Sequence, residues 1–517
     1  MSTSPPPTAV EPVEPVGQDA ADAAQLAALG YRQQLTRALG LWQNFSVGFT
    51  YLSPLVGVYS LFGYGLATGG PVFFWSIPIV LIGQGLVMLT FAEASSQYPI
   101  AGGIYQWTKR LVGPRYAWLS GWMYTWALLI TITSVAFPIA GYAGPLLGYP
   151  VNHATTVLTA VVVIVLCGAV NLAGVRRLAF AATAGVVAEV VGTVVLGLYL
   201  LFFHRHQGIS VIGHNLGAGG SGGQVGAFLA ATLFSVWIFF GFEACGDIAE
   251  EVKDPSRKIP RAMSMTLAVG GLATVILTLG LLLAVPDMGA VLSGKDTNPI
   301  GTILDASLGT VGAKFALALI VLGFISCVLA IQAAATRLVY SFARDGVIAG
   351  SRAFSTIHPT FHMPPGAIAV ATVVPAGITL LPSASVARII TFAVVGIYLG
   401  FQSVVLASAI ARARGWQPSG AFRLGRWGWA VNLLGLVYGV TAIIVLSVKT
   451  PANGTGFFDR WLVPLSVGIV LGAGILYLLI ARPRERIRDD ARVPAQAAEP
   501  VATGTEPTEP TEPTESA

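Results

Sequence analysis

Long apolar stretches separated by short polar connections dominate the chain. Most of them reach the roughly 20 residues that an α-helix needs to cross the hydrocarbon core of a bilayer. The pattern therefore predicts an all-α protein with about twelve transmembrane helices, in the approximate ranges 43–66, 72–97, 116–144, 154–173, 178–203, 227–249, 262–285, 313–341, 366–382, 386–410, 428–448 and 461–481.

Composition agrees with a membrane location. Of the 517 residues, 54% are hydrophobic and only 10% are charged, whereas soluble domains contain about 25% charged residues. The formal charge of +5 comes from Arg and Lys that flank apolar stretches, a distribution that orients membrane helices and requires no anionic polymer. We therefore expect the lipid bilayer as a partner, and no nucleic acid.

The two ends of the chain differ in composition from its middle. Residues 1–27 are rich in Pro, Ala and acidic side chains, and residues 482–517 end in an acidic repeat, so both are expected to be disordered tails. Residues 28–42 place apolar side chains at helical spacing opposite Arg32 and Arg37, which favours an amphipathic helix at the membrane surface. An early start of the first membrane span is the alternative.

Arg and Lys are distributed unequally between alternate connections. With the N-terminus inside, 23 of the 29 fall on the cytoplasmic side, as the positive-inside rule requires. We therefore expect a multi-pass protein of the cytoplasmic (plasma) membrane with both termini inside. The long connection 286–312 would then lie outside and could cover an entrance.

Two apolar helices contain residues that break a helix, five spans apart. The sixth span is interrupted at Phe240, Gly241 and Phe242, and the first carries Ser53 and Pro54. Secondary transporters often bind their substrate between such discontinuous helices, where freed backbone groups face polar ligands. The predicted substrate-binding residues are Ser53, Pro54, Leu55, Val56, Gly57, Phe240, Gly241, Phe242 and Glu243. The alternative is a pair of kinked helices that pack closely through small residues.

Aromatic residues surround the second break. Trp237 stands four residues before Gly241, one helical turn away, and is the candidate for a gate over a bound solute. For any single ring, packing against neighbouring helices is the alternative interpretation.

Carboxylates within the apolar stretches are few, and each is a candidate for function. Glu189 lies in the middle of the fifth span, where it could take up and release a proton and so couple transport to a proton gradient. A structural, protonated Glu is the alternative. Glu243 could bind a substrate amine or relay protons. Residues 247–251 include three more acids, Asp247, Glu250 and Glu251, which we expect to pair with Lys253, Arg257 and Lys258.

Signals for enzymatic chemistry are missing from the sequence. All six histidines fall in predicted connections, so the spans offer no His-based metal site and no nucleophile with its base. The sequence also contains no P-loop, which argues against ATP-driven transport by this chain. We expect no enzyme activity, no cofactor and no metal site.

Several motifs resemble those of the amino acid/choline transporter family, within the amino acid, polyamine and organocation (APC) superfamily. They are LGYRQQLTRALGLWQNFSVGF (29–49), EASSQYPIAGGIYQW (93–107), NLAGVRR (171–177), FFGFEACGDIAEEVKDPSRKIPRAM (239–263) and TRLVYSFARDGVI (336–348). The superfamily's Gly-Ser-Gly motif is absent from the first span, where Leu55, Val56 and Gly57 stand instead. This departure weakens a direct transfer of substrate contacts.

The resemblance implies a five-plus-five inverted-repeat fold in a transporter domain covering 43–481. Repeat one would cover 43–203, repeat two 227–410, and two extra helices would lie in 428–481. By position, the two breaks would face the carboxylate and amine of a substrate, and Trp237 would match the gating aromatic. Glu189 falls in the region where some relatives carry a lysine in place of a sodium ion.

The sequence therefore predicts a secondary active transporter for an amino acid or a small amine such as gamma-aminobutyrate. We expect alternating access coupled to protons. A sodium-coupled or exchange transporter of the same fold, or a membrane receptor that binds the solute without moving it, are the alternatives. The sequence carries no signal for an oligomeric state.

Overall fold

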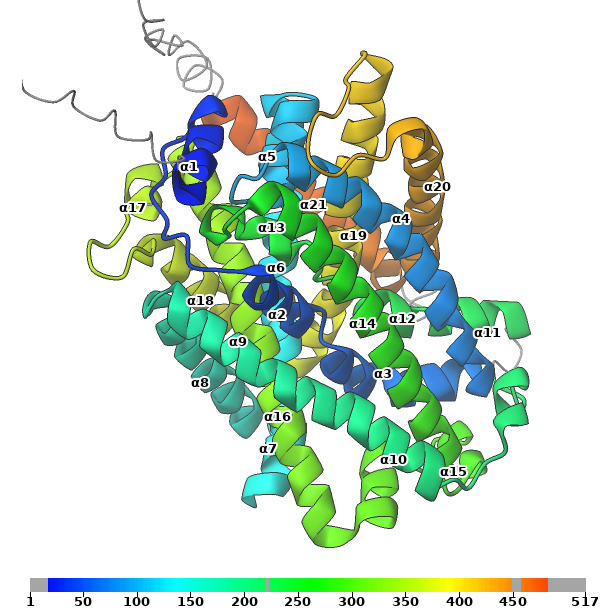
Figure 1. Ribbon diagram of the computed structural model, residues 1–517. Coiled ribbons are helices and arrows are strands. Elements are labelled where there is room, and N and C mark those ends of the chain that lie inside the picture. The colour runs from blue at the N-terminus through cyan, green and yellow to red at the C-terminus, as the bar shows by residue number, and fades with distance from the viewer. Residues whose placement is uncertain (1–16, 219–222, 449–456, 482–517) are drawn as a thin grey trace, which may run out of the picture.

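The computed structural model describes residues 17–218, 223–448 and 457–481 (Figure 1). In these ranges the chain is helical, with no β-sheet and one isolated bridge between Leu39 and Val252. The α-helices are α1 Gln18–Ala28, α2 Leu41–Leu52, α3 Pro54–Gly69, α4 Ser76–Gln97, α5 Gly103–Leu111, α6 Pro114–Ala136, α7 Ile139–Leu147, α8 His153–Leu172, α9 Val175–Val190, α10 Leu196–Phe203, α11 Gln224–Ala231, α12 Leu233–Ile238, α13 Ala244–Asp247, α14 Pro255–Ala284, α15 Met288–Leu292, α16 Pro299–Arg344, α17 Ser351–Ser355, α18 Pro365–Thr379, α19 Ser383–Ala413, α20 Gly428–Val448 and α21 Phe457–Ala481.

The expected spans are present. Within the described residues, ten helical stretches are long and apolar enough to cross a membrane, and they coincide with ten of the twelve predicted spans. The sixth and ninth spans correspond to two shorter apolar stretches, Gln224–Ile238 and Pro365–Thr379. The sixth is short because the helix stops before the break at 239–243.

Proline sets the start of several of these helices. It occupies the first helical position of α3, α6, α14, α16 and α18, where its missing N–H costs no hydrogen bond. The connection predicted at 286–312 is partly helical, because it contains α15 and the first part of α16. Gly309, with a φ of 62°, bends α16 there.

The N-terminal part of the chain differs from the prediction. Residues 18–27 were expected to be disordered, but α1 forms there and buries Asp22 and Leu26. Residues 29–40, which we call the strap, are not helical, so the predicted amphipathic helix is wrong, as is an early start of the first span. Leu35 and Leu39 are buried against other elements instead of facing lipid. The expected tails at 1–16 and 482–517 lie outside the described residues.

The two broken helices lie at the centre of the bundle. The first membrane helix is divided into α2 and α3, and the sixth into α11 with α12 on one side of its break and α13 on the other. These are the positions that a five-plus-five arrangement requires, with α20 and α21 added. α2 packs against α9, α14 and α16, while α3 packs against α11, α12 and α16. In Figure 1, α1, α5 and α17 lie at one end of the molecule, and α7 and α15 lie at the other.

Candidate functional site

The first break is a single residue, Ser53. Its φ of 41° is a left-handed conformation that non-glycine residues seldom adopt, and the following Pro54 cannot donate a helical hydrogen bond. The Ser53 hydroxyl oxygen accepts a hydrogen bond from the Val56 N–H at 3.1 Å, and so caps the start of α3. The strained residue is thereby stabilised by its own side chain.

Glu189 binds directly to this break. Its carboxylate is fully buried and accepts hydrogen bonds from the Ser53 hydroxyl and, at 3.1 Å, from the Leu55 N–H. A carboxylate in this position also interacts favourably with the positive end of the α3 dipole. The candidate proton-coupling residue and the first candidate binding segment therefore form one unit.

The helix that carries Glu189 changes its winding immediately after this residue. Residues Val191–Val195 form a π-helical turn, an arrangement often found at functional sites. The Tyr59 hydroxyl of α3 donates a hydrogen bond to the Gly192 carbonyl in this turn at 3.2 Å. A second contact thus joins α3 to the irregular part of the fifth span.

The second break covers residues 239–243. Gly241 has a φ of 114°, a conformation that residues with a side chain rarely adopt. Its N–H donates a hydrogen bond to one Glu243 carboxylate oxygen at 2.7 Å, and the Tyr124 hydroxyl donates to the other at 2.9 Å. Both oxygens of the fully buried Glu243 therefore have a donor.

The two breaks touch each other. A Cβ atom placed on Gly241 would lie 2.5 Å from the backbone nitrogen of Leu52, the residue before Ser53. A Cβ atom on Gly57 would overlap the side chain of Ile238, the last residue of α12. The structure therefore brings the segments 53–57 and 240–243 together, and it requires glycine for close approach at both positions.

The aromatic residues of the second break divide into two groups. Trp237 lies edge-on to Phe240, with ring centroids 5.7 Å apart, and Phe240 lies edge-on to Tyr51 of α2 at 6.1 Å. Phe242 instead packs among Phe91 and Phe401, at 5.7 and 5.4 Å. The candidate gate therefore contacts the first break through Phe240, whereas Phe242 anchors the second break to α4 and α19.

The acidic side chains after Glu243 do not pair as the sequence suggested. Glu250 forms an ion pair with Arg344 at 2.9 Å, and Glu251 forms one with Arg337 at 2.7 Å, so their predicted pairing with Lys253, Arg257 and Lys258 is wrong. The carboxylates turn inward, against α16, because the chain after the short α13 forms a tight 3-10 turn at Ala249–Glu251 instead of continuing the helix.

Asp247, which was also expected to pair with a nearby basic residue, makes no ion pair among the described residues. It is fully buried, and neither of its carboxylate oxygens has a hydrogen-bond partner among the described residues. It lies close enough to Glu243 for the two carboxylates to interact electrostatically. The available signal was its spacing of four residues from Glu243, which can place two side chains on the same face of a helix.

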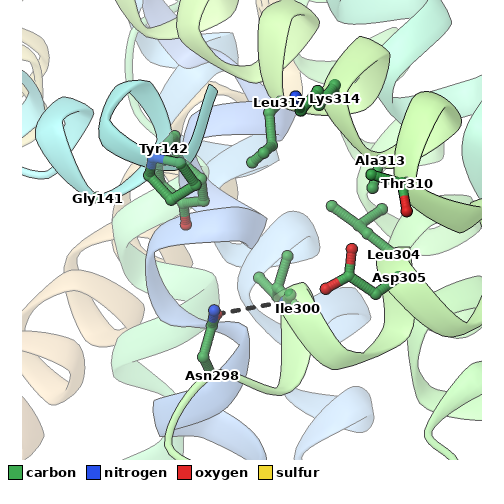
Figure 2. Close-up of a pocket in the computed structure, with 12 residues that line it drawn as sticks. Gly141, Tyr142, Asn298, Ile300, Leu304, Asp305, Thr310, Ala313, Lys314 and Leu317 are labelled. Atoms are coloured by element: carbon green, nitrogen blue, oxygen red, sulfur yellow. Dashed lines mark hydrogen bonds between the residues drawn. The ribbon is translucent and has the colours of Figure 1, made fainter. Parts of the chain in front are cut away.

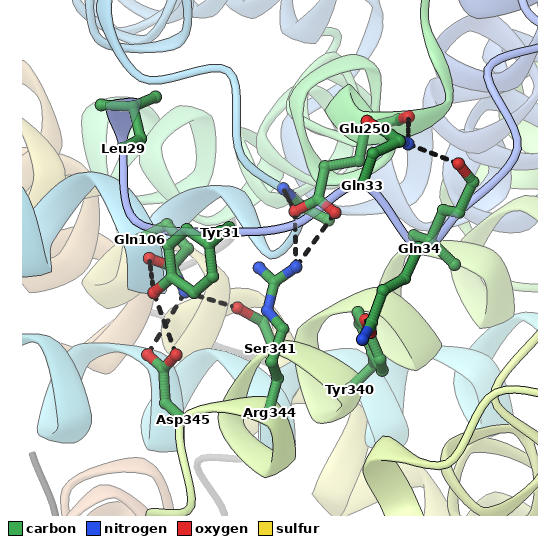
Figure 3. Close-up of polar contacts among 12 residues, drawn as sticks. Leu29, Tyr31, Gln33, Gln34, Gln106, Glu250, Tyr340, Ser341, Arg344 and Asp345 are labelled. Atoms are coloured by element: carbon green, nitrogen blue, oxygen red, sulfur yellow. Dashed lines mark hydrogen bonds and ion pairs between the residues drawn. The ribbon is translucent and has the colours of Figure 1, made fainter. Parts of the chain in front are cut away.

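Polar contacts hold the strap against α5 and α16 (Figure 3). The Tyr31 hydroxyl lies 2.9 Å from an Asp345 carboxylate oxygen and 3.1 Å from the Gln106 side-chain oxygen, and its one proton can be donated to either. Lys109 of α5 binds the same Asp345 at 2.5 Å. Burial, together with the charge of Asp345, raises the pKa of Tyr31, so its phenol keeps the proton that it donates.

Backbone hydrogen bonds join the strap to the segment after α13. The N–H groups of Ala38 and Leu39 donate to the Glu251 carbonyl at 3.0 and 2.9 Å, and the Lys253 N–H donates to the Leu39 carbonyl at 3.0 Å. The strap leads directly into α2. The first and sixth membrane helices are thus connected at this end as well as at their breaks.

We expect Arg337→Met to destabilise the protein strongly. Arg337 and Glu251 are both buried, and removal of one partner of a buried ion pair costs about 3–5 kcal/mol because the other charge is left uncompensated. Denaturation of the purified protein in detergent would measure the loss. Adding Glu251→Gln should recover much of it.

Lys109→Met provides the comparison for this ion pair. Lys109 is 21% exposed and Asp345 6%, whereas Arg337 and Glu251 are 1% and 0% exposed, so we expect a smaller loss of stability than in Arg337→Met. Equal losses in the two variants would show that the deeper burial of the Arg337 pair adds nothing to its contribution to stability.

A cavity of about 190 Å³ lies toward the other end of the molecule, between α7 and both parts of α16 (Figure 2). Tyr142 lines this cavity and donates a hydrogen bond to the Tyr59 carbonyl of α3 at 2.7 Å. Asp305 and Lys314 also line it. Tyr142 thereby links the wall of the cavity to α3.

The chain resembles known permeases along most of its length. The model of the amino acid permease family matches residues 39–473. The chain is 24% identical to the amino-acid permease BAT1 of Arabidopsis thaliana over 461 residues. These residues cover 82% of this chain and 88% of the relative. It is 25% identical over 521 residues to a putative polyamine transporter of Candida albicans, covering 92% of each protein.

A third relative is the GABA-specific permease of Saccharomyces cerevisiae. It is 25% identical over 510 residues, which cover 92% of this chain and 88% of the relative. The family model spans both broken helices, Glu189 and the residues that bind the strap. The chain therefore belongs to the amino acid permease family, and it is a multi-pass membrane transporter, not an enzyme.

Proposed function

We propose that the chain is a proton-coupled permease that moves an amino acid or a related small amine, such as gamma-aminobutyrate, by alternating access. The observation that carries this proposal is the contact between the two helix breaks, with Glu189 bound to one of them and Glu243 part of the other. The names of relatives, which include a GABA-specific permease and a putative polyamine transporter, support the substrate range.

Glu189 is the proposed proton carrier. As a carboxylate it accepts from both Ser53 and Leu55, and so holds the start of α3 against α9. Protonation removes its charge and one acceptor position, which weakens its attraction to the helix N-terminus. Proton binding would thereby loosen the first break from the fifth span, and proton release would restore the contact.

The strap would be the inner closure in this mechanism. The proposed orientation places α1 and the strap in the cytoplasm, with both termini inside and the 190 Å³ cavity on the outer side of the plasma membrane. Opening toward the cytoplasm would then require the contacts of Tyr31, Lys109 and the Glu251 carbonyl to separate. Trp237, which contacts Phe240, would open and close over the substrate.

The two repeats, 43–203 and 227–410, would supply one broken helix each. In this arrangement Ser53 to Gly57 and Phe240 to Glu243 would surround the solute, while the helices in 428–481 would lie outside the repeats. Movement of one broken helix relative to the other would change which side of the membrane the site faces.

Uptake into proteoliposomes tests this function. Labelled amino acids and amines would be offered with proton and sodium gradients imposed separately. Accumulation driven by the proton gradient is the expected result. Accumulation that follows only sodium, or exchange that needs an internal substrate, would favour the alternative transporters. Binding without any flux would identify a receptor.

A further inference from the structure

A groove of about 450 Å³ lies beside the strap, and we call it the arginine groove. It is formed by Leu41 at the start of α2, by Arg257, Arg261 and Met265 in the first turns of α14, and by Phe422 in the connection from α19 to α20. None of the residues at the two helix breaks lines it. The arginine groove is therefore separate from the candidate transport site.

The two arginines supply an unbalanced positive charge. Arg257 and Arg261 are exposed, and neither forms an ion pair with the described residues. They stand four residues apart on α14, so they lie on the same face of the helix, where like charges repel each other. A guanidinium group donates paired hydrogen bonds that match the oxygens of a phosphate. A phosphate between the two side chains would remove the repulsion and use these donors.

The apolar side of the groove continues along α14. Met265, Ala268 and Leu272 follow Arg261 at intervals of three or four residues, which places them on the same helix face. Ala268 and Leu272 are exposed. The helix rises about 16 Å from Arg261 to Leu272, which is about half the thickness of the hydrocarbon core of a bilayer. A hydrocarbon chain that starts at the groove could therefore run along this face.

Exposed tryptophans indicate the depth of the groove in the membrane. Trp42 directly follows Leu41 in the first turn of α2, and Trp429 lies in the first turn of α20. Their side chains are 67% and 55% exposed. Tryptophan is enriched where lipid headgroups meet the hydrocarbon core. The arginine groove thus lies at the depth of the headgroups, while the exposed face of α14 leads from it toward the bilayer centre.

We infer that the arginine groove binds an anionic phospholipid, with the phosphate between Arg257 and Arg261 and one acyl chain along the face of α14. Basic pockets between membrane helices bind such headgroups. Charge complementarity selects this occupant, because a zwitterionic lipid would bring an ammonium group close to two arginines. A soluble phosphate would leave the apolar face uncovered. The inference requires a membrane location and is independent of the substrate and of the coupling ion.

The bound lipid would also hold the strap in place. Leu41 directly follows the strap, and the Lys253 N–H, just before α14, donates to the Leu39 carbonyl at 3.0 Å. A lipid in contact with both Leu41 and Arg257 adds a link between the same two parts of the chain. A ligand that binds one conformation more tightly than another shifts the population toward it. Anionic lipid should therefore favour the conformation in which the strap is closed.

Lipid binding to the purified wild-type protein tests the occupant. Native mass spectrometry would compare phosphatidylglycerol with phosphatidylcholine of the same acyl chains. We expect a Kd for phosphatidylglycerol at least about tenfold lower than for phosphatidylcholine. Glycerol 3-phosphate, which lacks the acyl chains, should compete only at about hundredfold higher concentration or above. Equal affinity for the two lipids, or competition by glycerol 3-phosphate at the concentration of the lipid, would overturn the inference.

The double variant Arg257→Gln with Arg261→Gln tests the position of the site. It should raise the Kd for phosphatidylglycerol about tenfold or more and leave the Kd for phosphatidylcholine within about twofold of the wild-type value. Arg176→Gln with Arg177→Gln is the matched control, because it also removes two exposed arginines, from the start of α9 outside the groove. Equal losses of phosphatidylglycerol affinity in both double variants would overturn the assignment to the groove.

Thermal unfolding separates a lipid from an occupant within the chain. Phosphatidylglycerol should raise the unfolding temperature of the wild-type protein more than phosphatidylcholine does, because a ligand of the folded state stabilises it. This difference should disappear when Arg257 and Arg261 are both replaced by Gln. If that variant were instead less stable by the same amount in both lipids, the arginines would bind an acidic segment of the chain, such as residues 482–517, and the inference would be overturned.

Discussion

Glu189→Gln should abolish accumulation against a gradient while exchange continues. Glutamine reproduces the protonated side chain: its carbonyl can accept from the Leu55 N–H, and its amide can donate to the Ser53 oxygen. The helix break therefore keeps its partners but loses the group that takes up and releases a proton. With a proton gradient imposed, internal substrate should rise only to the external concentration, whereas counterflow exchange should stay within about twofold of the wild-type rate.

Glu189→Asp gives the complementary comparison. Aspartate still titrates but is one methylene shorter, so it cannot contact Ser53 and Leu55 as Glu189 does. It should retain some gradient-driven accumulation at a reduced rate. If Glu189→Gln still accumulated substrate at the wild-type level, the proton would have to be carried by another group, and the contact with Ser53 would be structural.

The spans and their breaks could be predicted because each depends on local sequence. An apolar stretch must be helical to satisfy its backbone in lipid, and Pro54 and Gly241 mark where the helices open. The hydrogen bond between Ser53 and Glu189 could not be predicted in this way. It joins residues 136 positions apart, and no pattern along the chain specifies which helices lie side by side.

The errors near the N-terminus have a similar origin. Periodic apolar residues in 28–42 predicted a helix facing lipid, but those side chains pack against the protein, and the strap backbone pairs with the segment after α13. Likewise, basic residues close in sequence were expected to neutralise Glu250 and Glu251, yet arginines of α16 do so. In both cases, contacts with residues distant in the sequence determine the structure, and the local sequence pattern does not show them.

Asp247 illustrates the same limitation. From sequence alone it belonged to a run of acids at the end of a span, and its neighbours in that run do form ion pairs. Only the three-dimensional arrangement separates it from them, because it is the member of the run whose oxygens have no partner among the described residues.

Gly241→Ala should eliminate transport and destabilise the protein. The added methyl group would lie 2.5 Å from the Leu52 backbone nitrogen, and alanine disfavours the φ of 114° that this position requires. Backbone atoms cannot move aside as the end of a flexible side chain can, so the two breaks must separate. We expect uptake to fall at least about a hundredfold, measured in proteoliposomes alongside thermal unfolding in detergent.

Gly85→Ala is the matched control for this substitution. Gly85 lies within α4, and a Cβ atom there would meet nothing within 4 Å, so alanine should be neutral or slightly stabilising. Normal uptake and stability in Gly241→Ala would mean that the breaks do not touch during transport. If Gly241→Ala were folded but inactive, the contact between the breaks would be required for transport and not only for folding. Alternating access predicts this result, because it depends on movement of one broken helix relative to the other.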